Sequence, residues 1–517
     1  MLPLVRRALL LLVFAFAFVS VSEAQITNVT DDVATPIPGA GHDYIRLLSE
    51  TVNPANGSLS LRISVPLPKG RGITLPFSFG YDSDGVHHIL GAAPVPGQAE
   101  WQSNTDSFAQ GGWSYDYPSL KASQWTVQVA VLTGNNNGQP VYTYYPCNYE
   151  SSYLFRDASG GTHAMGVGAL WTSNPPPGGC IGGPSVTGGD AQTKATLTTD
   201  GQGQVFALPA TVFDAAGTVY YFPTLPGGGF PTSSVFSGVP AYIEDRNGNK
   251  VTATQNGNTS FSFTDTLGRT LISVNGFGPS GATNTLTFPG MSYQVTWKTA
   301  TASFSVPSTQ IPEPGTSCVW PTNASDSQVV ISKITLPNGQ FYQFYYGTDN
   351  PDPNFQNPYG LLSEIIYPSG GWVKYQWKLS DTMNEFVAYA AQASGGQLGD
   401  AVPDGCTYQY KTPVVASRQV GFGASANPSL TQSFTYSTTW NSAGVQWVAK
   451  NTQVTTTDSV RSPAVSALTS YSYSPVPAAA VPFADTSYPG QIPVESSTAA
   501  YNWGNTSNPL RTVTKTW

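Results

Sequence analysis

The 517-residue sequence has few charged residues: Asp, Glu, Lys and Arg make up only 10% of it, against about 25% in an ordinary globular domain. The net charge is −8, and no basic run follows Arg6-Arg7. The chain therefore lacks the positive patch that nucleic acids and anionic membranes require. Disorder is excluded for most of its length, because disordered segments combine low hydrophobicity with high charge.

The sequence also lacks the common catalytic motifs. Neither G-x-S-x-G nor H-E-x-x-H occurs. The four histidines are His42, His87, His88 and His163, and His163 lies in a hairpin pattern that favours a structural role. A glycosidase needs two facing carboxylates, but no context distinguishes any of the glutamates Glu50, Glu100, Glu150, Glu244, Glu313 and Glu364. We therefore expect no catalytic residue, no cofactor and no enzymatic activity.

Metal-binding patterns are weak. Asp245-x-Asn247-x-Asn249 matches the start of a calcium loop, but an EF-hand needs Gly where Lys250 stands and Glu where Asn256 stands. We interpret this segment as a turn that Asp245 caps, and we expect no metal. The four cysteines have no C-x-x-C spacing and allow two disulfides in three connectivities, or buried thiols: Cys147, Cys180, Cys318 and Cys406.

The N-terminus has the order of an export signal. Arg6 and Arg7 precede an apolar stretch over 8–19, and Ser22-Glu-Ala24 forms a small-x-small cleavage site. The alternative, a membrane anchor, needs about 20 apolar residues, and this stretch has twelve. We expect a signal peptide over 1–24, a mature chain beginning near Gln25, no later membrane span, and a secreted, periplasmic or cell-surface location.

Glycine (52 residues), proline (42) and aromatic residues (12%) are abundant, which is typical of a turn-rich β protein. No amphipathic helix of typical length is predicted, and one short passage, MNEFVAYAAQASGGQL (383–398), is helix-like. The composition and patterning therefore predict an all-β fold.

A hairpin pattern occurs twice between Ile331 and Trp377. ISKITLPNGQFYQFYY and LLSEIIYPSGGWVKYQW align at a spacing of 31 residues, and apolar residues alternate before and after each turn. Alternation of period two predicts strands with one buried face. Pro337 and Gly339, and then Pro368 and Gly370, supply the two turn corners. Such repeated hairpins build an extended wrapped sheet, because each copy buries its face against neighbours.

Related turns lie upstream. Asp245 and Gly248 in YIEDRNGNKVT recur as Asp265 and Gly268 in SFTDTLGRTLI. VFDAAGTVYYF contains the same D-x-x-G spacing. Spacings of 20 to 31 residues are typical of stacked supersecondary units.

Alternating aromatic residues in the two hairpins allow two interpretations: packing within the sheet, or stacking on sugars. The residues concerned are Tyr342, Tyr346, Trp372, Tyr375 and Trp377. Trp372 falls on the opposite face from Tyr375, so it contacts a neighbouring turn or faces a ligand.

Strand–P-x-G–strand units alternating with D-x-x-G turns resemble the YD-repeat family of bacterial Rhs (rearrangement-hot-spot) proteins. GSLSLRISVPLPKGRGITLPFSFGYDS, from Gly57 to Ser83, is similar to the segment that precedes the repeats in that family, and the resemblance covers about 45–120, 205–275, 328–380 and the last seventeen residues. It implies a hollow β-sheet shell, often with a C-terminal toxin. We divide the chain into 1–24 signal peptide, 25–45 lead-in, 46–200 N-terminal β region, 201–380 YD-repeat-like β region and 381–517 C-terminal β region.

The leading hypothesis is therefore a non-enzymatic exported β-shell protein, and the alternative is a glycan-binding adhesion module. LRTVTKTW, the C-terminal residues, alternate like a strand without a capping turn. We expect an open sheet edge there, which further repeats or a toxin domain in the same polypeptide would cover.

Overall fold

The structure is a computed structural model that describes residues 45–516 except 47–48, 66–72, 74, 76, 87, 92–98, 103–104, 107, 137–138, 158–160, 172–184, 200–204, 224–233, 257–258, 312–319, 321–322, 391–404, 424–426 and 478–490. It confirms the all-β fold, with 65% of residues in strands. In the described ranges the helical elements are three short 3-10 turns: η1 (Ser83–Gly85), η2 (Gly347–Asp349) and η3 (Pro353–Phe355).

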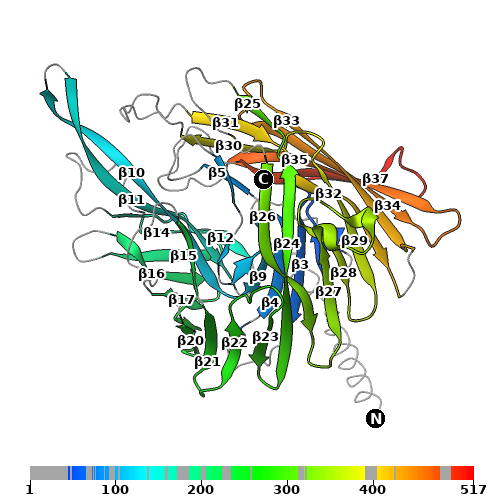
Figure 1. The fold of residues 1–517 in the computed structure, drawn as a ribbon, viewed down its shortest axis with the longest axis horizontal. Coiled ribbons are helices and arrows are strands. Elements are labelled where there is room, and N and C mark those ends of the chain that lie inside the picture. The colour runs from blue at the N-terminus through cyan, green and yellow to red at the C-terminus, as the bar shows by residue number, and fades with distance from the viewer. Residues whose placement is uncertain are drawn as a thin grey trace, which may run out of the picture. The chain divides into compact units, whose positions relative to one another are not determined.

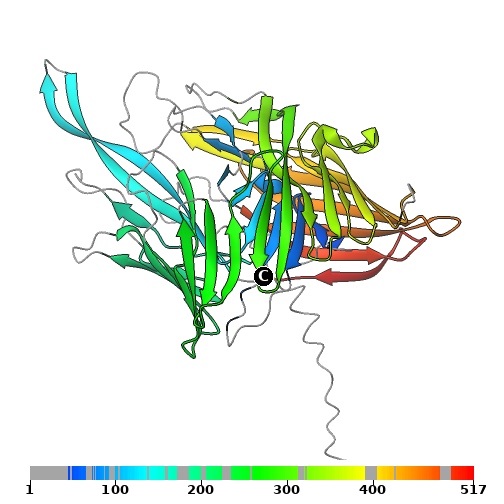
Figure 2. The same ribbon diagram turned by 60° about the horizontal axis from the view of Figure 1, so that its bottom comes forward.

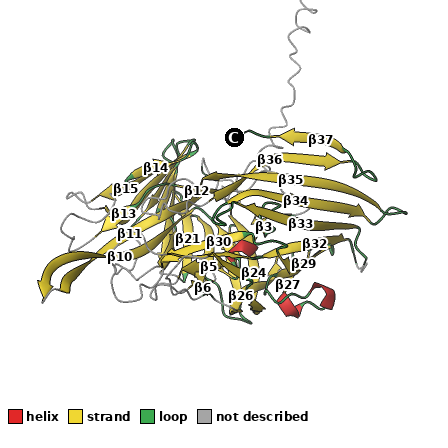
Figure 3. Cartoon of the chain, turned by 90° about the horizontal axis from the view of Figure 1, so that it is seen from above, coloured by secondary structure: helices red, strands yellow, loops and turns green. Residues whose placement is uncertain are grey.

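The largest sheet has 20 strands, is antiparallel throughout and does not close on itself. Most neighbours in this sheet are also neighbours in the sequence, so the sheet is a succession of hairpins, and Figure 3 shows β29 and β32–β37 side by side in order. In sheet order the strands are β14 (Thr187–Gly189), β15 (Thr193–Thr199), β16 (Val205–Asp214), β17 (Val219–Phe222), β19 (Tyr242–Glu244), β20 (Lys250–Asn256), β21 (Ser260–Asp265), β22 (Thr270–Asn275), β23 (Thr283–Phe288), β24 (Met291–Ser305), β26 (Asn323–Thr335), β27 (Phe341–Tyr346), β28 (Leu362–Ile366), β29 (Trp372–Leu379), β32 (Pro413–Gly421), β33 (Leu430–Trp440), β34 (Trp447–Asp458), β35 (Val465–Pro477), β36 (Gln491–Tyr501) and β37 (Pro509–Thr514).

Four smaller sheets accompany it. The N-terminal sheet has seven strands: β1 (Ile45–Arg46), β2 (Glu50–Val52), β3 (Leu59–Val65), β4 (Phe77–Asp82), β9 (Trp113–Asp116), β8 (Ala109–Gln110) and β7 (Thr105–Asp106). A five-stranded sheet contains β12 (Thr162–Ala164), β11 (Gln139–Arg156), β10 (Ser119–Asn136), β18 (Ser234–Gly238) and β13 (Ala169–Trp171). The last two sheets are β25 (Ser308–Ile311), β31 (Gly405–Tyr410) and β30 (Glu385–Ala390), and then β5 (His88–Gly91) and β6 (Ala99–Gln102).

The predicted turns recur with one geometry. In the three D-x-x-G turns the aspartate Oδ1 accepts hydrogen bonds from the backbone N–H groups two and four residues later, at 2.8 to 2.9 Å. The glycine of each has a φ of +75° to +83°. Gly339 and Gly370 take the same left-handed conformation, at φ +83° and +81°, so the glycines are needed for the backbone angle. The D-x-x-G segment at Asp245 is therefore a capped turn, as interpreted from the sequence.

The core lies between the N-terminal sheet and the large sheet. Leu59, Leu61, Ile63 and Val65 alternate along β3 and are buried, while the residues between them are partly or fully exposed. This apolar face packs on the buried face of the large sheet, and Figures 1 and 2 show the blue strands β3 and β4 lying against β24 and β26. This packing keeps water from the apolar face of the large sheet where the N-terminal sheet lies on it.

Aromatic side chains join the two layers. Phe77 lies 5.3 Å from Phe288 between ring centroids, and Trp113 lies 4.9 Å from Phe344. The Trp113 Nε1–H donates to the Tyr346 hydroxyl at 2.6 Å, and that hydroxyl donates to the Ile331 carbonyl at 2.7 Å. Pairs of this kind add to area burial and satisfy the polar tips of the rings.

A fully buried ion pair also links the layers. Glu50 on β2 pairs with Arg418 on β32, and neither side chain is exposed. Arg418 also donates to Gln432 Oε1 at 3.0 Å, and the Tyr367 hydroxyl donates to Glu50. A buried charge is tolerated only when such partners surround it.

The helix-like passage at 383–398 is wrong where the structure describes it, because Glu385–Ala390 forms strand β30 and pairs with β31; pairing across the sheet overrides a local preference that was weak. The signal peptide (1–24), the lead-in up to residue 44, and the side chains of Cys147, Cys180, Cys318 and Cys406 lie outside the described residues.

Replacing Gly370 by Ala should lower the free energy of unfolding by about 1 kcal/mol, because an L-residue pays that much in the left-handed region. A Cβ at Gly370 would meet no atom within 4 Å, so the cost is conformational alone. The matched control is Gly371→Ala, one residue later, where φ lies outside the left-handed region and a Cβ would meet its nearest atom at an ordinary 3.5 Å. Urea denaturation measures both; equal midpoints for the two variants would contradict the turn geometry.

Replacing Arg418 by Met should destabilise the fold by about 3–5 kcal/mol, because Glu50 would remain buried without its cation. The double variant Glu50→Gln/Arg418→Met should recover a large part of that loss. Denaturation midpoints of the two single variants, the double variant and the parent complete the cycle. Strict additivity of the two single effects would show that the pair is not coupled.

Candidate functional site

A recess lies where three distant segments meet: the Asn53–Asn56 turn, Asn384 just before β30, and strands β32–β34. Its volume is about 230 Å³, including its open mouth, which is below the 300–1,000 Å³ of typical ligand pockets. Ten residues line it: Ala55, Asn56, Asn384, Val414, Tyr436, Ser437, Thr438, Lys450, Asn451 and Thr452.

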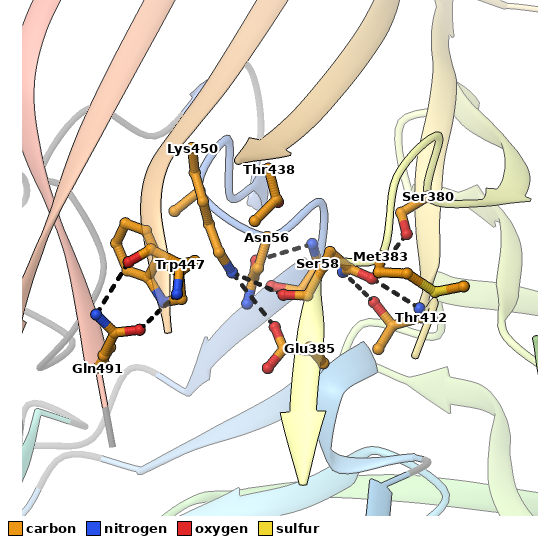
Figure 4. Close-up of polar contacts among 12 residues, drawn as sticks. Asn56, Ser58, Ser380, Met383, Glu385, Thr412, Thr438, Trp447, Lys450 and Gln491 are labelled. Atoms are coloured by element: carbon orange, nitrogen blue, oxygen red, sulfur yellow. Dashed lines mark hydrogen bonds and ion pairs between the residues drawn. The ribbon is translucent and has the colours of Figure 1, made fainter. Parts of the chain in front are cut away.

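Lys450 is the central charge of the recess (Figure 4). Its side chain is 7% exposed. The ammonium donates to the Asn384 carbonyl at 3.0 Å and lies 3.5 Å from Glu385 Oε1. Its Nζ also lies 5.3 Å from the centroid of the Trp447 ring. These contacts neutralise and orient the cation, so it is held as a structural group.

Asn384 fixes the other side of the recess through its amide. Its Nδ2–H₂ donates to Thr412 Oγ1 at 2.6 Å, and its Oδ1 accepts from the Thr412 backbone N–H at 2.9 Å. Ser380 Oγ donates to the same Oδ1 at 2.7 Å. Because both ends of the amide are hydrogen-bonded, the segment that leads into β30 is held in place.

The 380–384 segment is also bonded to β33. The Trp440 Nε1–H donates to the Met383 carbonyl at 2.9 Å, and the Thr438 N–H donates to Thr382 Oγ1 at the same distance. On the next strand, the Trp447 backbone exchanges two hydrogen bonds with the Gln491 side chain, at 2.8 and 3.0 Å.

Asp84 lies on the N-terminal side of this cluster, in η1. It accepts from Asn56 Nδ2 at 2.6 Å. Desolvation by the surrounding protein atoms raises the pKa of the Asp84 carboxyl above its usual range, and the negative charges of Asp82 and Glu385 raise it further. Because the side chain is itself exposed, water moderates this effect. Two carboxylates and an ammonium therefore share one junction.

The polar groups of the recess hold distant segments of the chain together. Thr452 Oγ1 donates to the Pro54 carbonyl at 2.5 Å across 398 residues of sequence, and Lys450 ties β34 to β30. The recess residues hydrogen-bond mainly to backbone groups of the neighbouring segment, so the arrangement fixes three segments against one another. The sequence did not single out Asp84, Asn384 or Lys450, because no local motif marks them.

His163 is buried and bridges two carboxylates. Its Nδ1 lies 2.7 Å from Asp190 Oδ2, and its Nε2 lies 3.1 Å from Asp157 Oδ2. The hydrogen bond with Asp157, followed by that with Asp190, raises the pKa of His163 against the effect of burial. Asp190 also caps the β14–β15 turn through Gln192 and Thr193. His163 thus ties the five-stranded sheet to the β14–β15 turn of the large sheet.

The candidate glutamates do not come together in the described part of the chain. Glu50 pairs with Arg418, and Glu244 lies 3.4 Å from Lys250. Glu364 is 6% exposed, and burial raises the pKa of its carboxyl. The side chains of Glu100, Glu150 and Glu313 lie outside the described residues, as do those of His42, His87 and His88.

The five aromatic residues considered for sugar stacking belong to the core. Tyr346 and Tyr375 are fully buried, and Trp372 is 7% exposed. Tyr342 and Trp377 pack against the core, and the Trp377 indole N–H donates to the Leu362 carbonyl at 2.9 Å. Packing, rather than sugar stacking, accounts for these rings.

In the described ranges, no group of three or more His, Cys, Asp and Glu side chains is placed to hold a metal ion. No helix in those ranges has the length and hydrophobicity needed to cross a membrane.

Replacing His163 by Gln should remove a pH-dependent part of the stability. Because the folded pKa is raised, the histidine stabilises the fold fully below its unfolded pKa of about 6.5, and this contribution fades as pH rises through the folded pKa. The difference in urea midpoint between the parent and the variant should therefore be largest at pH 5 to 6 and should become smaller at higher pH. A gap that is constant from pH 5 to 9 would contradict the charged bridge.

Neither the family models nor the curated proteins contain a match to the chain. Among solved structures, the chain is similar to the one described as "Crystal Structure of TcdB2-TccC3", with 9% sequence identity and a TM-score of 0.27. The similarity covers 85% of this chain and 38% of that chain, so this chain spans well under half of the length of the structure it matches.

Proposed function

We propose that the protein is an exported, non-enzymatic β-shell protein of the YD-repeat (Rhs) kind, which serves as a scaffold or encapsulating segment. The observation that carries this proposal is the open 20-stranded antiparallel sheet with the N-terminal sheet packed on its apolar face. Among the residues that the structure describes, the main polar junction of these hairpins has no ligand-sized pocket. Such an arrangement is more typical of an enclosing scaffold than of an enzyme.

The repeated turns support the family assignment within this proposal. The turns at Asp214, Asp245 and Asp265 share one set of hydrogen bonds. The hairpins β26–β27 and β28–β29 follow one another in the same sheet with glycines of matching φ. The signal peptide predicted for 1–24 places the scaffold outside the cytoplasm in this proposal.

The partner that we propose is further β structure, either additional repeats or a toxin domain. Among the described residues β37 pairs with β36 only, and nearly all of its residues are exposed. An uncovered strand presents free backbone donors and acceptors, so β37 suits the addition of another strand.

The alternative function, a glycan-binding adhesion module, has one specific observation in its favour. Trp503, in the turn before β37, is 42% exposed. A flat exposed ring complements the apolar face of a sugar, although the rings first considered for this role are buried.

We expect the purified chain to turn over no substrate in panels of glycans, esters and peptides, and to bind no glycan on an array. Two variants make each result interpretable: Lys450→Met for turnover, and Trp503→Ala for binding. Turnover abolished by Lys450→Met in a folded protein would overturn the non-enzymatic proposal. Glycan binding abolished by Trp503→Ala would establish the adhesion alternative in its place.

A further inference from the structure

The β10–β11 hairpin extends beyond the sheet that holds its base. β10 pairs with β18 only over Leu120–Gln124, and β11 pairs with β13 from Asn148 onward. Beyond these points the two strands pair only with each other in the described part of the chain. Figures 1 and 2 both show the hairpin, in cyan, running out past the neighbouring strands.

The outer part of the hairpin is unusually apolar for an exposed element. Leu132 is 60% exposed, and Tyr144, Val141 and Tyr142 are 44%, 42% and 36% exposed. The 28 residues over 122–149 include no Asp, Glu, Lys or Arg. A two-stranded ribbon on its own is marginally stable in water, and in the described part of the chain no third strand pairs with the outer hairpin. Exposed apolar side chains on such an element indicate a partner.

The two edges of the hairpin differ in their protection. β11 contains Pro140 and Pro146, and prolines on an edge strand block the addition of another strand. Along β10, the residues over 125–136 include neither a proline nor a charged residue. Among the described residues, nothing pairs with this edge of β10 beyond Gln124, and no proline or charge in 125–136 opposes the addition of a strand there.

The register identifies which groups would pair. Pro146 lies opposite Gln128, and Ala130 lies opposite Tyr144, without a register shift between the two pairs. Because proline has no N–H, the Gln128 pair is of the type that exchanges no hydrogen bond, and the N–H groups of such residues point outward. The N–H of Ala130, two residues along the strand, points outward as well.

We propose that β10 is a self-association edge, on which β10 of a second copy pairs antiparallel to form a four-stranded ribbon. An antiparallel strand pairs with its own copy around a two-fold axis, so the interface is complementary to itself. That symmetry sets residues near the axis against their own copies, and a charge there would be repelled. The residues over 125–136 carry no charge and meet this condition, and the valines at 127, 129 and 131 favour a strand.

The test is the oligomeric state of the full chain by sedimentation over a range of concentrations. The parent should dimerise, and Ala130→Pro should raise the dissociation constant at least about tenfold, a change of about 1.4 kcal/mol. The matched control is Tyr144→Pro, which puts the same residue on the opposite edge of the same pair and should leave the dimer intact. Amide exchange followed by mass spectrometry should show protection of 125–136 that rises with concentration in the parent and in Tyr144→Pro, and much less in Ala130→Pro.

Three outcomes would overturn the proposal: a parent that stays monomeric at high concentration, equal effects of Ala130→Pro and Tyr144→Pro, or a dimer that Thr512→Pro in β37 abolishes and Ala130→Pro does not. If amide exchange shows that either proline opens the hairpin, the lysine pair Ala130→Lys and Tyr144→Lys replaces it. Ala130→Lys should then weaken the dimer more than Tyr144→Lys, and the difference should shrink at high salt.

Discussion

The packing of the N-terminal sheet on the large sheet is the constraint on which the rest of the structure depends. An antiparallel sheet of 20 strands presents one apolar face, and that face must be covered. β3, β4 and β9 cover part of it with buried aliphatic and aromatic side chains, and Phe155 of the five-stranded sheet packs on Tyr220 and Phe222 of β17. The buried pair of Glu50 and Arg418 sets the position of one layer on the other, because an unmatched charge would remain if the layers shifted by one residue.

The polar junctions have a common role in this arrangement. Lys450, Asn384 and Thr452 fasten the segments around β30 and β34, and His163 fastens the five-stranded sheet to β14 and β15. Each junction joins elements that are not neighbouring strands of the large sheet. The apolar layer thus provides the bulk of the burial, and a few polar side chains determine how the peripheral strands are placed.

Local features of the fold could be predicted from the sequence because their causes are local. The alternation around Pro337–Gly339 and Pro368–Gly370 predicted both hairpins, and the D-x-x-G spacing predicted the capped turns. The partners of Glu50 and Lys450 could not be predicted, since each pair joins segments far apart and neither residue lies in a motif. Residues 385–390 were misjudged because a short apolar run does not distinguish a helix from a strand until its neighbours are known.

The long separation of these contacts has a consequence for how the chain is made. Glu50 and Arg418 are 368 residues apart, and Pro54 and Thr452 are 398 apart. At roughly 5–20 residues per second, β2 and the turn after it emerge on the order of 20–80 s before β32 and β34, to which they bond. For the first part of that time, until β24 and β26 are made, the apolar face of β3 and β4 has no layer to pack on. The two layers can therefore begin to pack when the middle of the chain is made, but the buried charge of Glu50 meets Arg418 only when the last third is available.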